Sequence, residues 1–185
     1  MLGGDRSDAV WEIDPPQYVT TVASQWYAPT VSAWVLLAYR LPREPSTPRI
    51  TLWRKLNRLG AARIGDGLAA LPLDSRTREQ LEWLADEVVE AGGEATIWIG
   101  APEPAAQERA LARTMAEAIA LEYATVVDEA AAALHDSPNV KKRTLARLRR
   151  ELRRIRGRDY FPTSERDRAH AEVERLAESL EVVEA

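Results

Sequence analysis

The residues best suited to chemistry in this sequence are ten basic side chains between Lys141 and Arg158, which Glu151 alone opposes. This segment therefore has a net charge of +9, in a chain of 185 residues whose net charge is −4. Apolar residues recur through the segment with helical spacing, so the basic side chains are expected to gather on the opposite face of one helix. That face consists of Arg143, Arg147, Arg150, Arg154 and Arg158. Each guanidinium donates two parallel hydrogen bonds to phosphate oxygens, so the pattern favours contact with a nucleic-acid backbone.

Two other interpretations of the basic segment remain open. Acidic residues flank it on both sides, among them Glu117, Glu122 and Glu129 before it and Glu172 and Glu174 after it. If neighbouring helices bring these carboxylates onto the arginines, the charge is neutralised inside the molecule and the protein is an interaction or scaffold module. The face could also meet another acidic partner. An uncovered face favours DNA, and a covered face favours the scaffold.

A smaller basic surface is expected on the helix that follows Pro48. Arg54 and Arg58 are candidate nucleic-acid contacts there, together with Arg49 and Lys55. The simpler interpretation is an ordinary amphipathic helix whose basic residues face water. On this helix we expect Trp53 to lie in the core, on the side of Ile50, Leu56 and Leu59.

The sequence offers little material for catalysis or metal binding. It has no cysteine, and neither His135 nor His170 has a neighbour at metal-ligand spacing. Asp66 lies in an Asp-Gly turn, and we interpret Asp159 as a cap or an ion-pair partner of an arginine. No glycine-rich phosphate loop and no nucleophile elbow occurs. We therefore expect no catalytic residue, no cofactor, no metal and no enzyme activity.

The sequence does not suggest a membrane or secreted protein. No segment reaches about 18 consecutive apolar residues, the length of a transmembrane helix. The N-terminus has no basic region followed by an apolar run, so it does not resemble a signal peptide. We expect a cytoplasmic protein that does not associate with membranes.

Hydrophobic patterning predicts a sheet with two helices in the first half of the chain. The expected elements are a strand at 32–41, a helix at 47–60 with Thr47 as its N-cap, strands at 61–65 and 68–73, a helix from Asp74, and a strand at 94–99. Asp66-Gly67 between the two apolar runs predicts a hairpin, and the spacing of Thr77 and Gln80 suggests a capping box. The order β-α-β-β-α-β is that of ferredoxin-like folds.

The remainder of the chain is predicted to be helical, with helices at about 104–134, 138–157 and from 164 onward. We therefore predict an α+β fold, a ferredoxin-like βαββαβ sheet domain with a C-terminal extension of three α-helices. Residues 1–31 are expected to form an N-terminal arm, 32–102 the ferredoxin-like half, and 103–185 a helical extension packed in the same unit. Ferredoxin-like modules often dimerise, so a homodimer is plausible.

The sequence resembles the N-terminal domain of the chromate-resistance regulator family ChrB. The resemblance is carried by WVLLAYRLP, PSTPRITLWRKLNRLGAARIGDGLAALP and LEWLADEVVEAGGEATIWIG, and by the later stretches EYATVVDEA and LRRELRRIRGRDYFP. It covers about residues 33–165. The hairpin departs from the family's usual Val-Tyr-Leu-Leu-Pro at residues 68–72. The resemblance implies a cytoplasmic bacterial protein linked to chromate resistance or transcriptional control, and DNA as its partner.

Two further expectations follow from resemblance. Full-length ChrB members carry a C-terminal domain associated with chromate response, and this sequence ends at Ala185, so we expect the chain alone not to respond to chromate; no other effector is indicated. The sheet more distantly resembles a module of CRISPR-adaptation nucleases, in which the first strand ends in Tyr-Asp. Here that position reads Tyr39-Arg40, and an arginine cannot ligate a cation. We therefore expect no nuclease activity.

Overall fold

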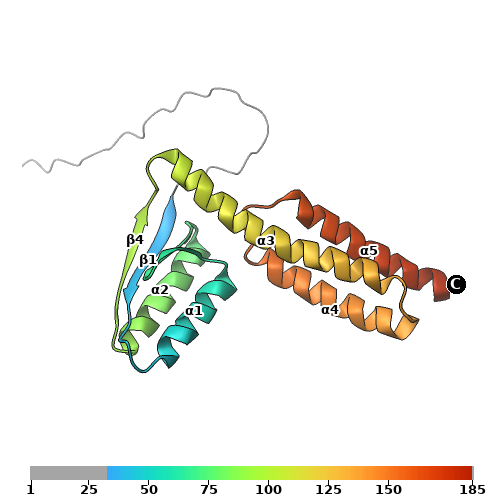
Figure 1. The fold of residues 1–185 in the computed structure, drawn as a ribbon, viewed down its shortest axis with the longest axis horizontal. Coiled ribbons are helices and arrows are strands. Elements are labelled where there is room, and N and C mark those ends of the chain that lie inside the picture. Colours follow the sequence, from blue (N-terminus) through green and yellow to red (C-terminus); the bar gives the residue numbers. More distant parts are fainter. Residues whose placement is uncertain (1–32, 185) are drawn as a thin grey trace, which may run out of the picture.

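A computed structural model describes residues 33–184 as a four-stranded sheet joined to three long helices (Figure 1). The elements are β1 (Trp34–Arg40), α1 (Thr47–Leu59), β2 (Ala62–Gly65), β3 (Leu68–Pro72), α2 (Ser75–Glu90), β4 (Glu94–Gly100), α3 (Ala105–Ala133), α4 (Pro138–Arg156) and α5 (Ser164–Glu184). Helices α1 and α2 lie beside the sheet, and α3 leads away from it into a bundle with α4 and α5 (Figure 1). The N-terminal arm predicted at 1–31 lies outside the described residues.

The sheet has the strand order β2-β3-β1-β4, and each neighbouring pair is antiparallel. With a helix after β1 and another after β3, this is the ferredoxin-like arrangement. The predicted α+β fold class, with three C-terminal helices, is confirmed. The predicted hairpin is also present: Gly67 has a φ of 132°, and a Cβ there would lie 2.5 Å from the carbonyl oxygen of Tyr39. Only glycine fits this turn without strain.

The helix starts differ from the predictions in detail. Ser46 is the N-cap residue of α1, so Thr47 is its first helical residue rather than its cap. The capping box of α2 joins Asp74 and Thr77, not Thr77 and Gln80. Thr77 N donates to Asp74 Oδ1 at 2.6 Å, and Asp74 N donates to Thr77 Oγ1 at 3.0 Å. An aspartate caps as well as a serine or threonine does, which moves the box three residues toward the N-terminus.

The prediction that Trp53 lies in the core is wrong. Its side chain is 47% exposed, and Ile50 is exposed to a similar extent. Helix α1 buries Leu52 and Leu56 instead. The buried stripe of α1 is therefore narrower than predicted, and it lies to one side of Trp53.

The apolar interior consists of two clusters that share α3. One cluster fills the sheet half and includes Ala112 and Met115 from the first half of α3. The other begins at Ile119 and fills the three-helix bundle. One continuous helix thus supplies both cores, which couples the bundle to the sheet. The division of the chain at residue 102 stays a prediction.

The segment between α4 and α5 forms a second connection between bundle and sheet. Phe161 is buried in the sheet core, with its ring centroid 6.0 Å from that of Trp34. Tyr160 Oη donates to the carbonyl oxygen of Leu59 at 3.0 Å, and Arg76 Nη1 donates to that of Gly157 at 3.0 Å. We call residues 157–161 the connector. It holds the C-terminal end of α4 beside the C-terminal end of α1.

We predict that Phe161→Ala destabilises the whole described unit. Removing a buried phenylalanine ring costs about 3–5 kcal/mol of unfolding free energy, through lost transfer energy and the cavity that remains. Leu121→Ala is the control, because Leu121 is 72% exposed and its truncation should change stability by less than about 0.5 kcal/mol. Urea unfolding of both variants measures the difference. Equal losses in the two variants would contradict a structural role of the connector.

Candidate nucleic-acid interface

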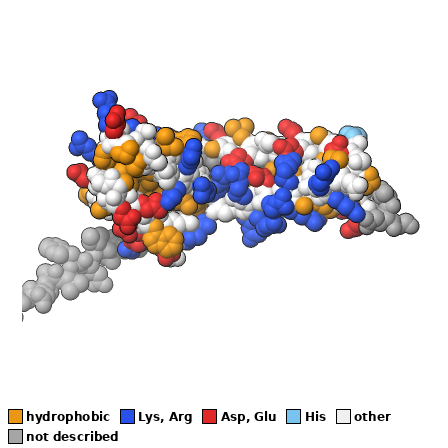
Figure 2. Space-filling model, turned by 90° about the horizontal axis from the view of Figure 1, so that it is seen from below, with side chains coloured by type: hydrophobic (Ala, Val, Ile, Leu, Met, Phe, Trp, Pro, Cys, Tyr) orange, Lys and Arg blue, Asp and Glu red, His pale blue; other side chains and the backbone are white. Residues whose placement is uncertain are grey.

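Four of the five arginines of the basic face lie on α4, and the fifth, Arg158, follows the helix in the connector. The position of the four on α4 depends on the apolar face of the same helix. Every residue of the predicted seam is buried against α3 and α5; these residues are Leu145, Leu148, Leu152 and Ile155. Because they point into the bundle, the arginines at the other helical positions point outward. Figure 2 views the molecule from the side of α1 and α4, and shows Lys and Arg side chains gathered along the bundle and at its junction with the sheet half.

Some of the predicted arginines form ion pairs with neighbouring helices. Arg147 Nη2 lies 2.6 Å from Glu129 Oε2 on α3. Arg154 pairs with Glu151 on its own helix, and its Nη2 lies 3.9 Å from Glu122 Oε2. Both arginine side chains are more than half exposed. Exposed pairs of this kind contribute about 0–1 kcal/mol each, so a phosphate could replace the carboxylate at small cost.

Arg158 differs from the other arginines, because its side chain is only 12% exposed. Its Nη2 forms a hydrogen-bonded ion pair with Glu122, and its Nη1 donates to the carbonyl oxygen of Asn57 at 3.4 Å. The guanidinium therefore bridges α3 and α1. This position gives Arg158 a structural role within the connector.

Arg143 and Arg150 form the uncovered part of the face. Both side chains are exposed, and neither makes an ion pair or hydrogen bond within residues 33–184. They are seven residues apart on one helix, which corresponds to about 10.5 Å along its axis. Within residues 33–184, carboxylates of α3 and α5 pair with arginines of the segment between Lys141 and Arg158; among them are Glu122, Glu129 and Glu174.

The smaller basic surface on α1 is present. Arg54 and Arg58 are exposed and lie one helical turn apart. Lys55 is used within the molecule, since its Nζ lies 2.6 Å from Glu87 Oε1 on α2. The exposed ring of Trp53 lies next to Arg54 in sequence. The sequence did not reveal that Trp53 is exposed. Trp53 and Leu52 both lie about one helical turn before Leu56, so helical spacing alone does not decide which of the two is buried.

Asp159 and Tyr123 form a polar pair between α3 and the connector. Tyr123 Oη donates to Asp159 Oδ2 at 3.1 Å. Burial and the neighbouring carboxylate raise the pKa of Tyr123 to about 12. Burial also raises the pKa of Asp159, although the Tyr123 hydrogen bond and the charge of Arg166 oppose this. The pair holds the connector in place; the sequence indicated a polar partner for Asp159 but not a tyrosine.

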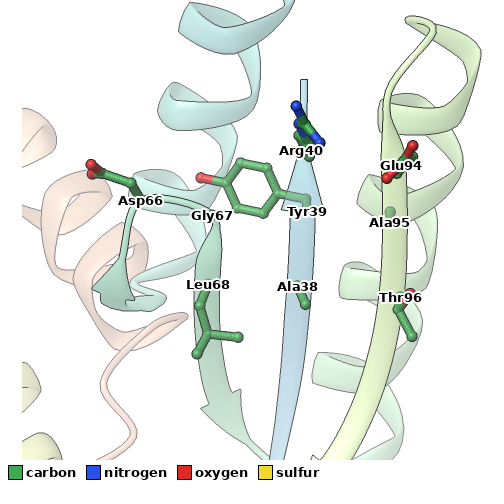
Figure 3. Close-up of a pocket in the computed structure, with 9 residues that line it drawn as sticks. All are labelled: Ala38, Tyr39, Arg40, Asp66, Gly67, Leu68, Glu94, Ala95 and Thr96. Atoms are coloured by element: carbon green, nitrogen blue, oxygen red, sulfur yellow. The ribbon is translucent and has the colours of Figure 1, made fainter. Parts of the chain in front are cut away.

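The end of the sheet at Arg40 does not resemble a metal centre. Figure 3 shows Arg40 on β1, Glu94 on the neighbouring β4, and Asp66 in the turn beyond Tyr39. Arg40 and Glu94 are opposite each other in the β1–β4 register. A guanidinium beside the carboxylate disfavours a bound cation. Among the residues that the structure describes, no group of three or more His, Asp or Glu side chains could hold a metal ion.

None of the helices within residues 33–184 combines the length and the apolar character that a membrane span requires.

Comparison with known proteins gives two matches. Residues 49–137 match the family model described as Protein ChrB, N-terminal. The curated Protein ChrB of Cupriavidus metallidurans is 31% identical over 144 residues, which cover 75% of this chain and 43% of that protein. The chain thus spans less than half the length of this relative. No solved structure matches the present chain. The family match contains Arg54 and Arg58, and it ends before Arg143.

We predict that Asp159→Asn changes how stability depends on pH. The pKa of Asp159 is raised above its ordinary value of 3.8, so the folded state holds this proton more tightly than the unfolded state does. The stability that the protonated Asp159 contributes to the fold is fully present below pH 3.8. It is lost as the pH rises through the higher pKa that Asp159 has in the folded state. Above that range the variant should therefore gain stability relative to the wild type. Urea unfolding across this range measures the difference, and a difference that does not change with pH would contradict the prediction.

Proposed function

We propose that this chain, which belongs to the ChrB N-terminal domain family, binds DNA and acts in transcriptional control linked to chromate resistance. The contact surface would be the basic face of α4 together with the exposed arginines of α1. The proposed site comprises Arg143, Arg147, Arg150 and Arg154 on α4, and Arg54 and Arg58 on α1. Arg158 would not contact DNA but would hold α1 beside α3, through its bonds to Asn57 and Glu122. The proposal places the protein in the cytoplasm and assigns it no catalytic residue.

The observation that carries the proposal is the incomplete neutralisation of α4. Arg143 and Arg150 have no carboxylate partner within residues 33–184, and the paired Arg147 and Arg154 remain largely exposed. A folded protein with net charge −4 that concentrates so much positive charge on one helix provides a site for a polyanion. Duplex DNA presents phosphates along both strands, and a row of guanidiniums can follow them.

Contacts of this type position a protein on DNA without reading its sequence. The proposal therefore concerns affinity and orientation, and assigns no base contact. Because the connector holds the ends of α4 and α1 together, both helices could engage one stretch of backbone. Of the six arginines in the proposed site, Arg143, Arg150, Arg54 and Arg58 are exposed and are not held in ion pairs with carboxylates, so we count these four as phosphate contacts.

The ion pairs support a second candidate, a protein-interaction or scaffold module whose basic helix is neutralised internally. Glu129 pairs with Arg147, Glu122 with Arg158, and Glu174 with Arg149, at 3.5 Å between Oε1 and Nη2. In this alternative the arginines stabilise the bundle. Replacing these arginines would then lower the thermal stability of the protein and leave its affinity for DNA unchanged.

We predict that Arg143→Ala and Arg150→Ala weaken DNA binding and leave folding unchanged. Four phosphate contacts give a slope of log K against log salt of about −3.6, and each lost contact reduces its magnitude by about 0.9. The loss should be alike for different duplex sequences, because the contacts are to phosphates. Fluorescence anisotropy with mixed-sequence duplexes at several salt concentrations measures the slope, and thermal melting measures stability.

Arg78→Ala is the matched control for this experiment. Arg78 is an exposed arginine on α2 that pairs with Glu82 at 2.8 Å, and it lies outside the proposed surface. Its removal should leave the slope unchanged. Lower melting temperatures for the α4 variants, with the wild-type salt slope, would favour the scaffold over DNA binding.

A further inference from the structure

The two edges of the sheet are built differently. β2 forms one edge; it has only four residues, carries Arg63, and its pairing with β3 shifts register between Arg63 and Gly65. Short length, a charged residue and a bulge are the features by which proteins protect an edge from pairing with another strand. The β2 edge is therefore protected.

The opposite edge, formed by β4, is longer and has no bulge, and its one charged residue, Glu94, lies at its first position. β4 has seven residues, and its pairing with β1 runs in continuous register from Glu94 to Gly100. Its other side has no strand partner within residues 33–184. Trp98 is 60% exposed and Ile99 is 54% exposed, and as consecutive residues they project from opposite faces of the strand. Such a long, regular and apolar edge is a template for pairing with another strand.

The charge pattern of β4 suits a second copy of the same strand. Glu94 is its one charged residue, and on its inner side it lies opposite Arg40. If two β4 strands pair antiparallel about Ile97, Glu94 of each copy lies opposite Gly100 of the other, and Thr96 lies opposite Trp98. No like charges then meet across the pair, and the exposed tryptophan ring lies over the neighbouring strand. Antiparallel pairing about one residue also has the two-fold symmetry of most homodimers.

We propose that two copies of this protein associate through their β4 edges, in antiparallel register about Ile97, to form one continuous eight-stranded sheet. The pairing satisfies the free backbone groups of both edges and covers Trp98 and Ile99. It also joins two apolar grooves, each of about 420 Å³, that Trp98 lines together with Leu36 and Ala70 on the sheet and Leu111 on α3. This inference is independent of DNA binding.

The first test compares the full chain with two tryptophan variants of equal exposure. Sedimentation equilibrium over a concentration series should give twice the chain mass of 20.7 kDa for the wild type. Trp98→Lys should raise the dimer dissociation constant at least about thirtyfold, as expected for a tryptophan at the centre of an interface. Trp83→Lys is the control, because Trp83 is also 60% exposed but lies on α2. It should leave the mass unchanged.

A second test does not depend on disrupting the protein. The chain has no cysteine, so a single introduced thiol reports on one contact. Residues directly opposite in an antiparallel pair have Cα atoms about 4.5–5.5 Å apart, within the range of about 4.4–6.8 Å that a disulfide spans. Ile97→Cys should therefore form a covalent dimer under mild oxidation, and Leu121→Cys on α3 should not.

Three results would overturn the proposal. The wild-type chain could sediment as a monomer. A dimer could persist in Trp98→Lys to the same extent as in Trp83→Lys. Ile97→Cys could cross-link no faster than Leu121→Cys.

Discussion

The arrangement of this protein depends on how the five residues of the connector are held between the bundle and the sheet. Phe161 enters the sheet core against Trp34, and Tyr160 donates to the end of α1. Arg158 bridges Glu122 and Asn57, and Asp159 accepts from Tyr123. These contacts comprise ring packing, hydrogen bonds and an ion pair, and all of them join segments that are far apart in sequence. Together with α3, which contributes to both cores, they form two connections between the halves.

This constraint determines what the basic residues can do. A three-helix bundle attached by one helix alone could change its angle to the sheet, and the arginines of α4 and α1 would then belong to separate surfaces. The connector instead holds the C-terminal ends of α4 and α1 together, because Arg158 lies close to Gly60, where a Cβ would approach the Arg158 Cβ to 3.0 Å. The partly buried ion pair of Arg158 thus supports the exposed arginines on either side of it. Arginine thus has two roles here: Arg158 joins α3 to α1, whereas Arg150 and Arg58 present their charge to solvent.

Sequence patterns predicted much of the fold, because local rules govern it. Three features can be recognised from a short stretch of sequence alone: the Asp-Gly turn, the proline at the start of α1, and the periodic leucines of α4. The failures occurred where distant residues decide. Whether α1 buries Leu52 or Trp53 depends on the sheet beneath it, and the partner of Asp159 is 36 residues away on another helix. Likewise, periodicity placed Arg158 with the exposed arginines, since nothing local reveals that α1 and Glu122 cover it.

We propose that the exposed arginines of α4 and α1 form one phosphate-binding surface, and that Arg158, which lies between the two helices, has a structural role. NMR spectra of the arginine side-chain Nε–Hε groups test it residue by residue during titration with a short mixed-sequence duplex. We expect the signals of Arg143, Arg150, Arg54 and Arg58 to shift together with one affinity, whereas that of Arg158 stays in place. Shifts confined to one of the two helices, or no shift at any of the four arginines, would contradict it.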